Sequence, residues 1–196
     1  MAANSELLMA LEQTLANIHP AIVAKLNPGL SVTEINKTAA SAQLTFTEEV
    51  YDLFIWKNGI QHQGINSIAQ LLLFPVGIPF TLAEAAHDYD LLSVTKQFFS
   101  PNYFPLFYGD NDDILLIDLD RDSDTYKKIC LYSAALMGEG DPITMFDSFS
   151  SMLETALVCY DQKAFWINYD RLEVNNDAHY RIGSDLNPNS EYWQVL

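Results

Sequence analysis

Residues 103–122 read YFPLFYGDNDDILLIDLDRD, and this stretch decides the fold. Two apolar runs, 103–108 and 114–119, stand on either side of a short acidic turn, so each run predicts a β-strand. The second run is apolar at almost every position, which is typical of a strand buried on both faces. Another acidic turn, at 120–125, leads to a further predicted strand at 128–133. The stretch therefore predicts the centre of a β-sheet.

Helical patterns precede this sheet in the sequence. Residues 5–26 place leucines on one helical face, with a break at Pro20. Three capping boxes, each a Ser or Thr followed three residues later by Glu, predict helices that begin after Ser31, Thr45 and Thr81. The second of these helices is expected to stop at an Asn-Gly pair, because glycine can take the left-handed conformation that ends a helix.

The remaining patterns complete the fold class. A turn is expected at 27–29, and short apolar runs at 70–74 and 76–80 predict two strands. The clearest amphipathic helix runs from 147 to 161. This order predicts an α+β fold, with an antiparallel or mixed sheet of about 4–6 strands flanked by helices.

The length fits one domain with elaborations. The chain has 196 residues, of which 49% are apolar, and this is enough to bury a sizeable core. We expect residues 1–161 to form the domain. Residues 162–196 are polar and mixed, and we expect them to form a C-terminal extension that its aromatic residues pack on the same domain.

The chain is strongly acidic, with a formal net charge of −16. Residues 1–98 carry a net charge of −5 and residues 99–196 one of −11, and seven aspartates lie between 110 and 124. Such a surface repels nucleic acids and anionic membranes and attracts basic proteins. Solubility alone is the alternative explanation of this charge.

The sequence favours a reducing compartment. Its two cysteines, Cys130 and Cys159, are too few for a disulfide scaffold and lack metal-ligand spacing. The N-terminal residues lack the basic start and apolar core of a signal peptide, and no apolar stretch has the length of a membrane span. We therefore expect a cytoplasmic protein.

Motifs that carry chemistry are few. Alternating aspartates at 118–124 resemble the start of a calcium loop, but an EF-hand needs Gly at its sixth and Glu at its twelfth position. Those positions hold Ser123 and Ile129. Carboxylates at 110–113 could serve acid–base chemistry, although aspartates also favour turns for local hydrogen-bonding reasons. The four histidines form no metal-binding pair, and we expect no catalytic residue, metal or cofactor.

Four segments occur in order along the chain: LNPGLSVTEI (26–35), TEEVYDLFIWKNG (47–59), the strand–turn–strand at 103–122 and the helix at 147–161. Together they resemble the SMI1/KNR4 (SUKH) family. The resemblance covers a lead-in helix, a helix that ends in aromatic-x-Asn-Gly, a central strand pair and a closing helix.

The resemblance implies an α+β domain without enzymatic activity. Many bacterial members of that family are immunity proteins that bind polymorphic toxins, often nucleases, and fungal members are adaptors in cell-wall synthesis and signalling. We therefore expect a non-enzymatic protein-binding domain, an immunity protein whose partner is a basic toxin domain, with neither nucleic acid nor membrane as a partner. The alternatives are an adaptor or regulatory module, and an enzyme if a deep pocket joins Asp, His and Tyr side chains.

The two acidic turns are the expected contact surface, because they concentrate the negative charge. The expected contact residues are Tyr108, Asp110, Asp112, Asp113, Asp120 and Asp122. The expected structural supports are Trp56, which would pack under the sheet and help to fix the acidic turns, together with Asn58 and Gly59.

Overall fold

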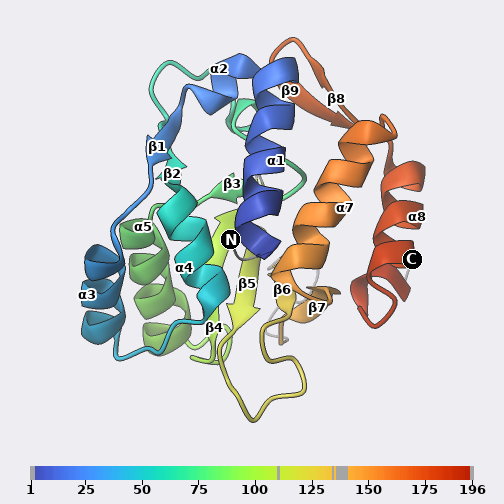
Figure 1. Cartoon of the computed structure of the whole chain (residues 1–196). Helices are drawn as coiled ribbons and strands as arrows, with labels where there is room; N and C mark the ends of the chain where they lie inside the picture. Colours follow the sequence, from blue (N-terminus) through green and yellow to red (C-terminus); the bar gives the residue numbers. More distant parts are fainter. Residues whose placement is uncertain (1–2, 110, 134, 136–140, 195–196) are drawn as a thin grey trace.

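The computed structural model describes residues 3–109, 111–133, 135 and 141–194 of the chain. It has an α+β fold in which helices flank an antiparallel five-stranded sheet (Figure 1), so the predicted fold class is confirmed. The N-terminal elements are α1 (Ala3–Ile18), α2 (Pro20–Val23), β1 (Leu26–Pro28), α3 (Val32–Ala42), α4 (Glu48–Trp56), β2 (Lys57–Ile60), the 3-10 helix η1 (Ile68–Gln70), β3 (Ile78–Pro79), α5 (Leu82–Asp88) and the π-helix η2 (Tyr89–Thr95). The C-terminal elements are β4 (Tyr103–Tyr108), β5 (Ile114–Asp118), β6 (Ile129–Tyr132), β7 (Ile143–Phe146), α7 (Phe149–Asp161), β8 (Phe165–Asn168), β9 (Arg171–Val174), α8 (Asn176–Leu186) and the 3-10 helix η3 (Tyr192–Gln194).

The main sheet has the strand order β3-β4-β5-β6-β7, and every neighbouring pair is antiparallel. Strand β5 lies at its centre, and all five of its residues are buried, as its continuous apolar pattern predicted. The edge strand β3 pairs Ile78 with Tyr108 and Pro79 with Phe107. Two smaller sheets join β1 to β2 and β8 to β9.

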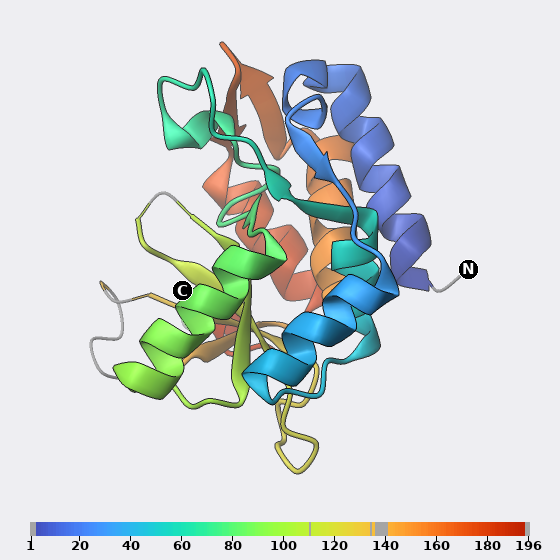
Figure 2. The same ribbon diagram turned by 90° about the vertical axis from the view of Figure 1, so that its left-hand side faces the viewer.

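Helices α1, α4 and α7 lie side by side across the sheet (Figure 1), with α8 next to α7. Helix α5 packs on β4 and continues directly into η2, while α3 packs against α5 (Figure 2). The apolar side chains that these elements bury form one continuous core. This arrangement places the end of α5 beside strand β4 of the sheet.

Two of the three predicted capping boxes are present. Ser31 and Thr81 each accept a hydrogen bond from the backbone N–H of the glutamate three residues later, which accepts one in return. The third prediction was wrong, because α4 has Thr47 rather than Thr45 at its N-cap. The preceding residue, Phe46, is buried against Phe104 with ring centroids 4.7 Å apart, so packing keeps this segment extended until Thr47.

Other local predictions were also wrong. Residues 70–74 form no strand, since the main chain turns back on itself there and the N–H of Gly77 donates to the carbonyl of Phe74. Only Ile78–Pro79 of the predicted second strand pairs with the sheet. Asn27 and Pro28 of the turn expected at 27–29 instead belong to strand β1. Helix α4 ends at Trp56, just before the predicted Asn58-Gly59, which belong to the paired strand β2.

The C-terminal segment packs on α7 and β7. Asn187 and Ser190 are buried, and their side chains donate hydrogen bonds to the Thr155 hydroxyl and the Thr144 carbonyl. The indole N–H of Trp193, which is 2% exposed, donates to the carbonyl of Met145. The sequence patterns did not predict α8, β7 or the β8–β9 hairpin.

Candidate functional site

The two acidic turns lie at opposite ends of strand β5. Tyr108 pairs with Ile114 beside the first turn, and Tyr103 pairs with Asp118 beside the second. The length of β5 separates the turns by roughly 14 Å, given a rise of about 3.4 Å per residue. In Figures 1 and 2 the β5–β6 loop projects away from the rest of the molecule. The structure therefore does not bring the predicted contact residues together.

The carboxylates of the β5–β6 loop serve the loop itself. Asp118 is buried and accepts hydrogen bonds from the Asp120 N–H at 2.9 Å and the Thr125 hydroxyl at 2.6 Å. Asp120 accepts one from the Asp122 N–H in the same way. These local bonds are the turn chemistry that aspartate favours. Asp120 and Asp122 are thus found in a self-supporting turn.

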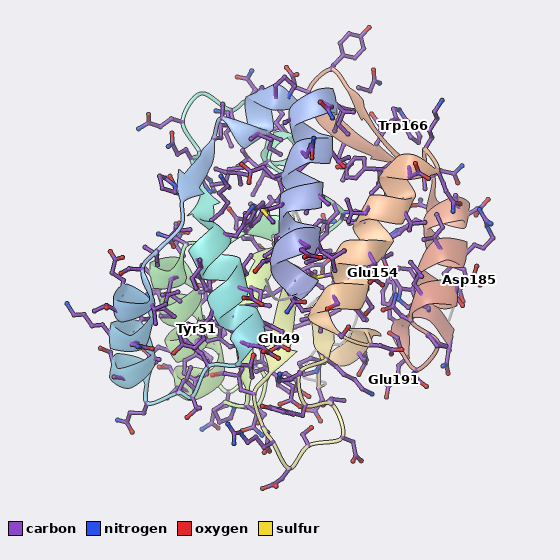
Figure 3. All side chains as sticks on the ribbon, in the orientation of Figure 1. Glu49, Tyr51, Glu154, Trp166, Asp185 and Glu191 are labelled. Carbon is purple, nitrogen blue, oxygen red and sulfur yellow. The ribbon has the colours of Figure 1, made fainter. Side chains whose placement is uncertain are left out.

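Lys127 connects this loop to helix α4 through two ion pairs. Its ammonium group lies 3.1 Å from a carboxylate oxygen of Glu48 and 3.0 Å from one of Glu49. Figure 3 shows Glu49 at the end of α4 that faces the loop. These contacts fix the position of the loop relative to the helical layer.

A hollow of about 440 Å³ opens beside the β4–β5 turn. Strand β4 brings Tyr108 to it, the turn brings Asp112, and the end of α5 brings Asp88. We call it the Tyr108 hollow and define it by four aromatic rings and two carboxylates: Phe80, Phe98, Tyr108, Tyr132, Asp88 and Asp112. Among the described residues, no lysine or arginine lines it. A second hollow of about 410 Å³ adjoins it and shares Phe80, Asp88 and Tyr108.

Tyr108 forms the wall between the two hollows. Its ring centroid lies 4.6 Å from that of Phe80, and its hydroxyl lies 2.9 Å from Nε2 of His62, whose ring stacks on it. Burial, followed by the nearby carboxylates of Glu84 and Asp88, raises the pKa of Tyr108 to about 12. The phenol therefore stays protonated at neutral pH, and because its hydroxyl is paired with His62 it presents mainly its aromatic ring to the hollow.

Asp88 gives the hollow a partly desolvated negative charge. Burial raises the pKa of its carboxyl group above the usual value, the carboxylate of Glu84 adds to the rise, and His87 opposes it. Asp112, from the β4–β5 turn, also lines the hollow and has the left-handed conformation, with φ of 58°. The hollow thus combines apolar walls with carboxylates from two different elements.

The sequence located part of this site. Tyr108 and Asp112 were predicted and line the hollow. Asp113 is half-buried and does not line it. The pKa of Tyr192 is raised by burial and, to a smaller extent, by the carboxylate of Asp113. Asp110 lies outside the described residues. Sequence reasoning did not single out Asp88. The pairing of β3 with β4 and the packing of α5 on β4 bring the end of α5 to Tyr108. The apolar run at 76–80 predicted a strand there but did not indicate its partner.

The three predicted supports have different roles. Trp56 is half-buried and its indole N–H donates to Glu12 at 2.8 Å, so it ties α4 to α1. Asn58 accepts a hydrogen bond from the N–H of Leu82 at 2.8 Å and thereby satisfies the first turn of α5. Gly59 has φ of 76°, and a Cβ there would lie 2.5 Å from the N of Thr81. Asn58 and Gly59 therefore support the wall of the hollow.

The chemistry of the hollow favours binding. Tyr108 lies beside His62 and Asp88, and this is the combination of Tyr, His and Asp side chains that would favour an enzyme. A phenol whose pKa is raised is a poor general base at neutral pH, and general acid–base groups work best with a pKa near the working pH. An aromatic wall with carboxylates at its opening is suited to hold an organic cation.

No family model matches the chain, and no curated protein matches its sequence. Within residues 3–109, 111–133, 135 and 141–194, no group of three or more His, Cys, Asp or Glu side chains is arranged to hold a metal ion. Over the same described part of the chain, no helix combines the length and apolar character required to cross a membrane.

The pKa of Asp88 predicts a gain in stability on neutralisation. Because this pKa is higher in the folded than in the unfolded chain, the ionised carboxylate destabilises the fold at pH 7. We expect Asp88→Asn to raise the Tm at pH 7 by about 1 °C, since water screens a half-buried charge. The gain should shrink as the pH falls through the raised pKa and vanish below about 3.9, where both states are protonated. Calorimetry from pH 3 to pH 7 measures this, and Asp124→Asn, at an exposed position, serves as the control.

The close approach at Gly59 predicts a specific loss. Gly59 and Gly64 both have positive φ, but only at Gly59 would a Cβ meet backbone atoms within 4 Å. We expect Gly59→Ala to lower the free energy of unfolding by at least about 2 kcal/mol and Gly64→Ala by about 1 kcal/mol, the cost of the conformation alone. Urea unfolding of the two variants tests this. Equal losses would mean that contact with Thr81 is unimportant.

Proposed function

We propose that the chain is a non-enzymatic immunity-type protein that binds and neutralises a basic toxin domain in the cytoplasm. The observation that carries this proposal is the Tyr108 hollow, which presents aromatic walls and two carboxylates and, among the residues that the structure describes, is lined by no lysine or arginine. A partner that inserts a cationic side chain would offset the desolvated charge of Asp88.

The net charge supports a basic partner. At −16, the chain attracts a positively charged surface over a distance and so accelerates association. A nucleic-acid-cleaving toxin presents such a surface, because it must bind phosphates. The four segments that resemble the SMI1/KNR4 family support a toxin rather than another basic protein as the partner.

The test is a growth experiment. The toxin domain encoded beside the gene of this chain is expressed in a bacterial host, alone and together with the chain. The proposal expects growth to be lost with the toxin alone and restored by the chain. A genome without a toxin gene beside this one, or a toxin whose effect the chain leaves unchanged, would contradict the proposal and favour an adaptor.

A further inference from the structure

The walls of the Tyr108 hollow suit a flat cation. Phe80 and Tyr108 stand against each other with their ring planes inclined by 40°. Phe98 also lines the hollow, but the ammonium group of Lys96 already lies 5.6 Å from its ring centroid. Phe80 and Tyr108 are therefore the walls left for a partner's cation. Aromatic faces attract cations, and a planar guanidinium also stacks on them. An ammonium group is more strongly hydrated and gains less from such walls.

The two carboxylates suit a forked donor. Asp88 belongs to α5 and Asp112 to the β4–β5 turn, so negative charge faces the opening from two elements. Within the described residues, neither carboxylate forms an ion pair with a lysine, arginine or histidine. A guanidinium group has five N–H donors in a fixed plane and can serve two carboxylates at once.

The hollow is large enough to receive a whole side chain. Its volume of about 440 Å³ lies at the low end of the range for ligand sites, about 300–1,000 Å³. Buried arginine anchors of this kind are frequent among the residues that dominate the affinity of protein interfaces.

We propose that the Tyr108 hollow receives a single arginine side chain of the partner protein, with its guanidinium plane against Tyr108 and Phe80 and its N–H groups donating to Asp88 and Asp112. This inference rests on the proposed function, since it names the group by which the partner is held. Lysine at the same position of the partner binds more weakly, because it lacks the plane and the fork.

The experiment uses N-acetyl-arginine amide as the probe and N-acetyl-lysine amide as the control, which carries the same charge without the planar guanidinium group. Each is titrated at low salt into the whole chain, labelled with ¹⁵N, and amide resonances are followed. The arginine probe is expected to shift the resonances of Asp88, Tyr108 and Asp112, with a Kd of about 1–10 mM. The lysine probe is expected to bind several-fold more weakly.

Two variants make the test specific. Asp88→Asn should weaken binding of the arginine probe about tenfold, as loss of one charged hydrogen bond would. Asp122→Asn removes the same charge from the opposite end of the sheet and should leave binding unchanged. The inference is overturned if the two probes bind alike, if the shifts lie elsewhere, or if the two variants behave alike. Growth rescue that persists despite such a result would leave the proposed function standing without the arginine.

Discussion

Replacing Asp88 and Asp112 together by lysine is expected to lower the affinity for the toxin domain at least about 100-fold. Both carboxylates line the Tyr108 hollow, so the variant removes two contacts and puts two positive charges in their place. Truncating a close charge pair at an interface costs about 2–5 kcal/mol, and repulsion adds to the loss. Titration calorimetry with the purified toxin domain measures the change, and circular dichroism checks that the variant is folded.

The matched control is Asp122→Lys combined with Asp124→Lys in the β5–β6 loop. Both double variants change the net charge from −16 by the same amount, so long-range attraction weakens equally. The control is expected to lose only a few-fold, mainly in the association rate. Similar losses in the two variants would show that net charge alone, rather than the hollow, determines binding.

The second large effect concerns stability. Trp193→Ala is expected to lower the free energy of unfolding by about 3–5 kcal/mol, because truncation of a buried tryptophan leaves a cavity. The ring is 2% exposed and packs edge-on against Phe146, His179 and Tyr192, with centroids 5.9, 5.1 and 4.7 Å away. The carbonyl of Met145 would also lose its indole donor.

Trp166→Ala provides the comparison for the same substitution. This tryptophan is 43% exposed on strand β8 (Figure 3), and we expect its replacement to cost less than about 1 kcal/mol. Urea unfolding followed by far-ultraviolet circular dichroism measures both variants without relying on tryptophan fluorescence. Equal losses would contradict the view that the C-terminal segment is part of the core.

The features predicted correctly from the sequence are those that short stretches determine. Ser31 and Thr81 cap their helices through bonds to residues three positions away, and an apolar run such as Ile114–Asp118 marks a buried strand by itself. The same chemistry is ambiguous elsewhere, because Asn175 is of a residue type that favours turns and here caps α8 by accepting from the N–H of Ala178. Asparagine suits both positions, and only packing decides between them.

The site was harder to predict because it is made by distant contacts. Tyr108 and Asp112 lie four residues apart in one strand–turn segment, so both could be predicted from the sequence. Asp88 reaches them only because Ile78 pairs with Tyr108 and the linker to α5 is fixed by Asn58. The apolar run at 76–80 predicted a strand but not its partner, and a side-chain hydrogen bond across 24 residues produces no periodic signal.

The central claim is that the partner is bound at the Tyr108 hollow, and a contact footprint tests it most directly. Amide resonances of the ¹⁵N-labelled chain are compared with and without the purified toxin domain. The account predicts that the largest shifts of amide resonances fall on Asp88, Tyr108 and Asp112, which folding brings to one hollow. The resonances of residues 119–128 should change little. Changes centred on residues 119–128, with the hollow unaffected, would contradict it.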